Sequence, residues 1–246
     1  MKKAFTLIEL VFVMIVLGIL TFTLWPKKEP TQALEAARQI VAHIRYTQHL
    51  ALNDDKFATH TDTGGTSSIA KDWYKRMWRI TFSNTAAVSG CKSGGWRYAV
   101  YQNIAGDLSD GGQPNGAAEA ARNPANGKAL SACYSGLSQN TSDELNLQQT
   151  YKITNIDFSD FATDSRIQGI IFDELGRAYP RGEWTTPYDN RRAFRFSEGD
   201  SSYGRIRLGA KDGSTASILV FGETGYACVE NVDIDCQAPA TPPATP

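Results

Sequence analysis

An apolar stretch near the N-terminus constrains this chain more than any other feature of its sequence. Residues Leu10 to Trp25 contain no charged side chain, and Glu9 stands directly before them. The 21 residues from Phe5 to Trp25 would form a helix about 30 Å long, which matches the hydrocarbon thickness of a bilayer. The stretch therefore predicts a transmembrane helix over residues 5–25. An ionised Glu9 within it would require a partner of opposite charge or a position at the interface.

The residues that flank this stretch separate it from an ordinary secretory signal. Lys2 and Lys3 precede it and favour a cytoplasmic N-terminus, although Lys27 and Lys28 follow it and weaken that bias. A secretory signal would carry a cleavage site of small residues after the apolar core. Residues 21–26 offer no such site, and the small residue Ala4 lies before the core instead.

The first ten residues resemble the class III signal of type IV prepilins and type II secretion pseudopilins, through Lys2-Lys3-Ala4 followed by Phe5-Thr6-Leu7-Ile8-Glu9-Leu10. The resemblance implies that a prepilin peptidase/methyltransferase cleaves between Ala4 and Phe5 and methylates the new amino group of Phe5. Ala4 stands where such signals more usually have glycine, a change that is expected to slow cleavage. The resemblance also implies that Glu9 faces the N-terminal amine of a neighbouring subunit and fixes the register of assembly. In the alternative interpretation, Glu9 belongs to a single-pass anchor and extends to the lipid headgroups.

A second helix is predicted from Thr31 to about Asp54. Pro26 either ends or kinks the first helix. Beyond it, apolar residues recur with a period of 3.6, at Leu34, Ala37, Ile40, Val41, Ile44, Ala51 and Leu52. Thr31 is a suitable N-cap, and residues 53–55 are a suitable end. The helix is thus expected to be amphipathic and to require a covering surface.

The chain after Lys56 is predicted to be rich in β-strands. Seven strands are expected, at residues 77–82, 96–101, 151–158, 167–172, 193–196, 203–208 and 217–221. Lys211-Asp212-Gly213 predicts a hairpin with a type I′ turn between the last two. The pilin resemblance implies an α+β fold, in which one long N-terminal helix, half transmembrane and half amphipathic, packs on an antiparallel β-rich head.

The expected organisation is a leader at residues 1–4, an assembly helix at 5–25, an amphipathic helix at 26–56, a β-rich head at 57–236 and a disordered or extended proline-rich tail at 237–246. Three further segments, residues 43–48, 170–177 and 216–222 before Gly225, resemble the H-type minor pseudopilins. Residues 60–165 are an enlarged insertion compared with that group.

The four cysteines, Cys91, Cys133, Cys228 and Cys236, all lie in the half that is expected to be exported. An even number of cysteines in an oxidising compartment predicts two disulfides, for which three connectivities exist. Sequence order favours Cys91 with Cys133 and Cys228 with Cys236.

No metal-ligand spacing or catalytic motif is present, and no cofactor is expected. His43 and His49 are six positions apart, on different faces of a helix, and are interpreted as solvated or interface residues. Asp233 and Asp235, like the loop at residues 107–112, could offer oxygen ligands to calcium, but they lack the ordered spacing of an EF-hand and are interpreted as turn formers. Asp173 and Glu174, before Gly176, are interpreted in the same way.

Two basic sets raise the question of nucleic acid. Residues 71–79 interleave basic and aromatic side chains, and Arg191, Arg192, Arg195, Arg205 and Arg207 form the second set. The net charge is −1, however, and the alternation of Trp78, Ile80 and Phe82 fits a half-buried strand with Arg79 and Thr81 facing outward. Nucleic acid is therefore not an expected partner.

The resemblance implies a structural protein and not an enzyme. The expected protein is a pseudopilin or minor pilin with a single pass through the inner membrane and its head in the periplasm, drawn into a filament with other pilins by an inner-membrane assembly platform. The alternatives are a minor pilin with a DNA-binding or adhesive head, and a membrane-anchored periplasmic enzyme.

Overall fold

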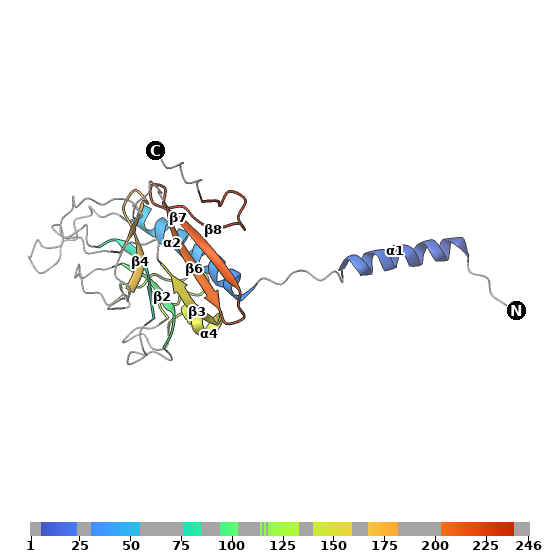
Figure 1. Cartoon of the computed structure of the whole chain (residues 1–246), viewed down its shortest axis with the longest axis horizontal. Coiled ribbons are helices and arrows are strands. Elements are labelled where there is room, and N and C mark those ends of the chain that lie inside the picture. Colours follow the sequence, from blue (N-terminus) through green and yellow to red (C-terminus); the bar gives the residue numbers. More distant parts are fainter. Residues whose placement is uncertain are drawn as a thin grey trace, which may run out of the picture. The chain divides into compact units, whose positions relative to one another are not determined.

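A computed structural model describes residues 6–23, 31–54, 76–84, 94–102, 114, 116, 118–132, 140–158, 167–181 and 203–238. The chain divides into two units, Met1–Pro30 and Thr31–Pro246. Figure 1 labels most of their helices and strands. The second unit is called the head below.

The first unit contains helix α1, Leu7–Thr23. The helix begins where the N–H groups of Glu9 and Leu10 donate to the carbonyl oxygen of Thr6, at 3.1 and 3.3 Å. Its 17 residues extend roughly 26 Å at about 1.5 Å per residue, less than the hydrocarbon thickness of a bilayer. Among the described residues, no helix is long and apolar enough to cross a membrane. The predicted transmembrane helix is therefore wrong, and the single-pass location in the inner membrane, which depended on it, is corrected with it.

Helix α2, Gln32–Leu52, is a separate helix, so the prediction of one long N-terminal helix is also wrong. Thr31 has an extended backbone, with φ −71° and ψ 157°, which no helix can run through. Its Oγ1 accepts a hydrogen bond from the backbone N–H of Leu34 at 3.4 Å, as the predicted N-cap. At the other end, Asn53 caps the helix within the predicted range.

In the part of the head that the structure describes there are two antiparallel sheets, and this part is mostly β. The first sheet has the order β2 (Arg97–Gln102), β1 (Trp78–Ser83), β4 (Ile167–Phe172), β5 (Ala178–Pro180). The second has the order β3 (Ile153–Asp157), β6 (Tyr203–Ala210), β7 (Thr215–Phe221), β8 (Ala227–Val229). A 3₁₀ turn, η2 (Asp143–Leu145), and the short helix α4 (Leu147–Thr150) precede β3.

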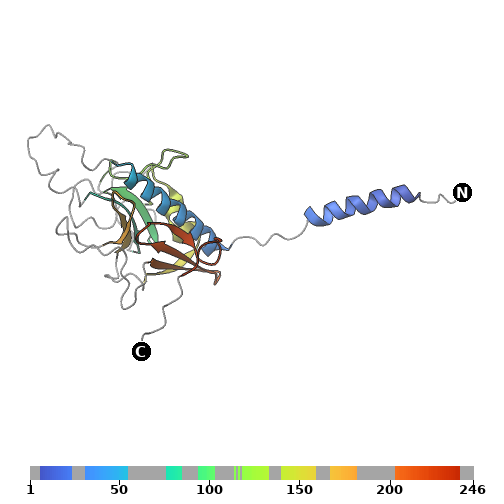
Figure 2. The same cartoon turned by 90° about the horizontal axis from the view of Figure 1, so that it is seen from above.

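Helix α2 contacts strands of both sheets, as Figures 1 and 2 show. Its buried residues are Ala33, Ala36, Ala37, Ile40, Val41, Ile44, Thr47 and Ala51. The apolar ones share one core with Phe82 and Tyr98 of the first sheet and with Ile206 and Val220 of the second. This face is broader than the predicted stripe because two sheets cover it. Leu52, at the end of the predicted stripe, is exposed.

Six of the seven predicted strands are confirmed within two residues at each end. The seventh, at residues 193–196, lies outside the described residues. Strands β5 and β8 were missed, because three residues are too few to show alternation. The hairpin between β6 and β7 is confirmed, but its turn is not type I′, which requires two positive φ angles. Among residues 211–213 only Gly213 has one, at φ +81°, and the N–H of Gly213 donates to Ala210, as in a type I turn closed by a glycine bulge.

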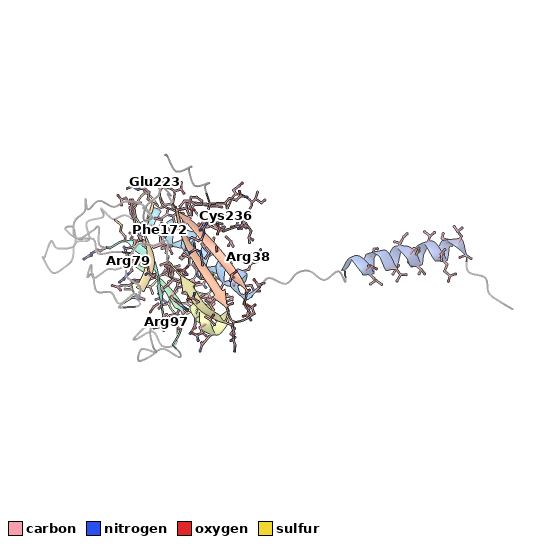
Figure 3. All side chains as sticks on the ribbon, viewed as in Figure 1. Arg38, Arg79, Arg97, Phe172, Glu223 and Cys236 are labelled. Carbon is pink, nitrogen blue, oxygen red and sulfur yellow. A yellow bond between two sulfur atoms is a disulfide. The ribbon has the colours of Figure 1, made fainter. Side chains whose placement is uncertain are left out.

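Strand β1 is covered on both faces, against the prediction that Arg79 and Thr81 face outward. Arg79 is 7% exposed and Thr81 is 1% exposed. The guanidinium of Arg79 lies over the ring of Tyr101, 5.8 Å from its centroid, and Thr81 Oγ1 contacts the Tyr101 hydroxyl at 3.5 Å. On this face Arg79 stands directly opposite Tyr101 of β2 and Ile171 of β4, so large side chains of both neighbouring strands flank it. Figure 3 labels Arg79 with Arg97 of β2 and Phe172 of β4.

Candidate functional site

Helix α1 presents apolar side chains on every side. All described side chains from Thr6 to Thr21 are exposed, and the large apolar ones range from Val16 at 38% to Leu7 at 82%. The helix therefore has no polar face that could mark a solvent side. A helix of this composition is normally buried against other apolar groups, so α1 is a candidate assembly surface.

Glu9 lies in the first turn of α1 and is its one charged residue. The first turn of a helix holds backbone N–H groups without helical partners, and the helix dipole favours a negative charge there. The predicted assembly residue therefore stands at the N-terminal end of the apolar surface. Ala4 and Phe5, the predicted cleavage site, lie outside the described residues.

A junction in the head joins the three segments that resembled H-type minor pseudopilins. Gln48 of α2 donates from Nε2 to the carbonyl oxygen of Gly176, at 2.8 Å, and to that of Thr224, at 2.6 Å. Gly225 has φ +63°, and a Cβ there would overlap the Gly176 carbonyl oxygen and Gln48 Nε2. The three segments thus meet at the amide side chain of Gln48, which is 128 residues from Gly176 and 176 residues from Thr224 in the sequence. The resemblance located Gly176 and Gly225 but gave no reason for them.

The turn that carries Gly176 is organised by Asp173, which is 1% exposed. Asp173 Oδ1 accepts from the backbone N–H groups of Leu175 and Arg177, at 3.0 and 2.8 Å. Its Oδ2 accepts from Arg177 Nε at 2.7 Å and from the Tyr179 hydroxyl at 2.9 Å. The hydrogen bond to Asp173 raises the pKa of Arg177. The carboxylate is fully engaged in holding the turn, as the interpretation of Asp173 as a turn residue requires.

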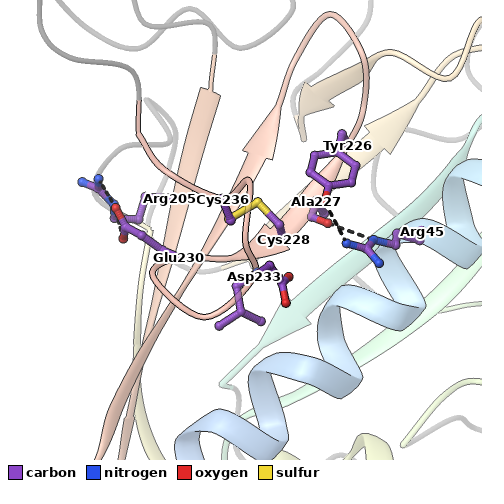
Figure 4. Close-up of a disulfide and its surroundings, with 9 residues drawn as sticks. Arg45, Arg205, Tyr226, Ala227, Cys228, Glu230, Asp233 and Cys236 are labelled. Carbon is purple, nitrogen blue, oxygen red and sulfur yellow. Dashed lines mark hydrogen bonds and ion pairs between the residues drawn. A yellow bond between two sulfur atoms is a disulfide. The ribbon is translucent and has the colours of Figure 1, made fainter.

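The disulfide between Cys228 and Cys236 is confirmed and closes a loop after β8 (Figure 4). Within this loop Asp233 Oδ2 accepts from the backbone N–H of Val229 at 2.9 Å, and Ile234 is 96% exposed. Asp233 is thus a turn residue, and in the described part of the chain no three His, Cys, Asp or Glu side chains are grouped to hold a metal. The loop at residues 107–112, the other calcium candidate, lies outside the described residues. Cys91 and Cys133 lie outside the described residues, so their pairing stays a prediction.

Three described arginines of the head, Arg45, Arg205 and Arg207, bind groups of the head itself. Arg45 of α2 donates from Nε to the carbonyl oxygen of Ala227 at 2.9 Å and lies over the ring of Tyr226 (Figure 4). Arg205 forms two hydrogen bonds with Glu230, at 3.0 and 2.7 Å, and Arg207 pairs with Asp157 at 3.0 Å. Two members of the second basic set are therefore neutralised by carboxylates, which disfavours them as phosphate ligands. Arg191, Arg192, Arg195 and residues 71–75 lie outside the described residues.

The two helical histidines have different surroundings. His49 is exposed and lies beside Asn53. His43 contacts the hydroxyl of Tyr98 at 2.7 Å through Nδ1, and burial lowers the pKa of His43, partly offset by the nearby carboxylate of Glu144. Sequence reasoning missed this contact because its partner lies 55 residues away on β2. Burial also raises the pKa of Tyr98, which keeps its hydroxyl proton.

Comparisons with protein-family models, with curated proteins and with solved structures found no match for this chain.

Proposed function

We propose that this protein is a filament subunit of the pseudopilin or minor pilin class. Its role is structural, and it assembles through α1 after cleavage between Ala4 and Phe5. The observation that carries the proposal is the arrangement of α1, a helix that is apolar on every side and has one carboxylate, Glu9, in its first turn.

The physical reason is that such a helix needs a cover and its carboxylate needs a partner. Large apolar side chains exposed along α1 favour association with like surfaces, at roughly 25 cal/mol per Å² of apolar area buried. Covering the helix would also desolvate Glu9, which is unfavourable unless an opposite charge is supplied. The amine created at Phe5 of a neighbouring subunit is such a charge. Cleavage and assembly are then coupled, because only a processed neighbour offers the amine close to Glu9.

The head supports the proposal because residues in or beside the segments that resemble H-type minor pseudopilins have a structural role. Gln48, Gly176 and Gly225 serve a packing junction that ties α2 to both sheets. A structural subunit needs its sheets fixed to α2, the helix that follows the assembly segment. The proposed partners are other subunits of the filament and the peptidase/methyltransferase that processes them.

The test is the mass of the mature N-terminus. In cells that hold a prepilin peptidase, we expect the purified chain to begin at Phe5 and to carry one added methyl group. The control is Phe5→Pro, which removes the secondary amide at the scissile bond and should leave the leader attached. A wild-type chain that retains Met1 in the presence of an active peptidase would contradict the proposal.

A further inference from the structure

A polar cluster of one buried and three half-buried side chains links α2 to the first sheet and to the 3₁₀ turn. Tyr98 of β2 is buried, and its hydroxyl contacts His43 Nδ1 at 2.7 Å and Gln39 Nε2 at 3.3 Å. Gln39 Nε2 also donates to the carbonyl oxygen of Glu144 in η2 at 3.1 Å, and Gln39 Oε1 accepts from the hydroxyl of Tyr151. The cluster thus connects one face of α2 with β2, η2 and the residue that follows α4.

The direction of each hydrogen bond in the cluster is determined by its neighbours. The Glu144 carbonyl oxygen can only accept, so it requires the amide nitrogen of Gln39 on its side. That nitrogen therefore donates to the Tyr98 oxygen, and Tyr98 uses its own proton toward His43. In this arrangement Nδ1 of His43 is an acceptor, which requires a neutral imidazole protonated on Nε2.

Protonation of His43 would reverse the direction of the hydrogen bond between Tyr98 and His43. Nδ1 would then carry a proton, and the Tyr98 oxygen would face donors from both Gln39 and His43. The hydroxyl proton of Tyr98 would lose its acceptor in a buried position, and an unpaired buried donor is unfavourable. Deprotonation of Tyr98 offers no relief, because burial raises its pKa.

Two carboxylates, on two different elements, bear on the cluster. Glu144 of η2 acts on His43, on Tyr98 and on Tyr151, and Glu35 of α2 acts on Tyr151. Asn123 Nδ2 donates to Glu144 Oε1 at 3.1 Å, which holds that carboxylate in place. For His43 the loss of hydration outweighs the attraction of Glu144, so the neutral imidazole is the favoured form.

We propose that the cluster of Gln39, His43, Tyr98 and Tyr151 is a proton-sensitive latch between α2 and the β2–η2 region, closed when His43 is neutral and loosened when His43 is protonated. The latch belongs to the head alone and does not depend on filament assembly.

The sign of the pH effect follows from the lowered pKa of His43. An unfolded chain protonates its histidines near pH 6.5, whereas folded His43 does so only at lower pH. Between these two values the unfolded state binds more protons, so the stability of the head falls as the pH falls. One such proton makes the unfolding equilibrium constant rise by up to about tenfold per pH unit in that window.

The test uses the full-length chain and two variants, His43→Gln and His49→Gln. Urea unfolding at several pH values from 7.5 to 5 should show the same acid-dependent loss of stability in wild type and in His49→Gln. His43→Gln keeps an acceptor for Tyr98 but has no imidazole to protonate. Its unfolding equilibrium constant should therefore rise less steeply than that of wild type as the pH falls, by a factor of up to about ten per pH unit. His49 is the matched control because it lies on the same helix and is exposed.

A second measurement keeps the proposal testable if His43→Gln does not fold. In a titration of the wild-type imidazole signals by nuclear magnetic resonance, His43 should change its chemical shift with a midpoint below 6.5, and the Tyr98 ring signals should shift with the same midpoint. A His43 midpoint at or above 6.5, or an equal pH slope in wild type and His43→Gln, would overturn the proposal. Tyr98 ring signals that do not shift as His43 titrates would also overturn the proposal, since they would show that the imidazole titrates without changing its hydrogen bond to Tyr98.

Discussion

At the scale of single residues, Glu9 is the position on which the proposed assembly depends. Its carboxylate stands in the first turn of a helix that is otherwise apolar, so its replacement changes charge at the end of the assembly surface without removing apolar area. We expect Glu9→Ala to fold its head normally but to enter filaments at least about tenfold less than wild type. The reason is that breaking a buried ion pair costs about 3–5 kcal/mol.

The matched control for this change is Glu35→Ala. Glu35 also lies in the first turn of a helix, and it is exposed. The measurement is the amount of each variant in sheared filaments, relative to its amount in the cell. Equal incorporation of Glu9→Ala and Glu35→Ala would remove Glu9 from the assembly mechanism.

At the scale of elements, the junction around Gln48 explains why glycine is required at the turn between β7 and β8. Gly225 has φ +63°, and any side chain there meets the Gly176 carbonyl oxygen and the Gln48 amide. We expect Gly225→Ala to lower the free energy of unfolding by roughly 3 kcal/mol or more, through backbone strain and the loss of both Gln48 hydrogen bonds. Urea unfolding of the purified wild type and variant measures this difference in the free energy of unfolding.

Gly213 provides the control for that substitution. It has φ +81° in the turn between β6 and β7, but beyond its two chain neighbours no atom lies within 4 Å of the position that a Cβ would take. Gly213→Ala should therefore cost only the conformational strain, about 1–2 kcal/mol. If both variants lost the same stability, the close approach at Gly225 would have no energetic weight.

At the scale of the whole molecule, the sequence predicted the elements better than their arrangement. Thr31 was identified as a cap because capping depends on a few adjacent residues, and β4 was predicted because its apolar run is local. The exposure of Arg79 was predicted incorrectly, since a strand's place inside a sheet depends on partners far along the chain. The contact of His43 with Tyr98 was missed for the same reason. The prediction of one long helix was wrong because apolar residues recur on both sides of Thr31, whereas the backbone of Thr31 itself is extended.

The division of the chain into two units leads to a prediction for the head alone. Among the described residues, those buried in the main core all lie at Ala33 or beyond, and α2, which both sheets cover, begins with its own cap at Thr31. The described side chains from Thr6 to Thr21 are all exposed. A chain that begins at Thr31 should therefore fold with the same cooperative thermal transition as the full chain, measured by circular dichroism, and should lose the ability to enter filaments. A head that melts without a cooperative transition would show that residues before Thr31 are needed for its core.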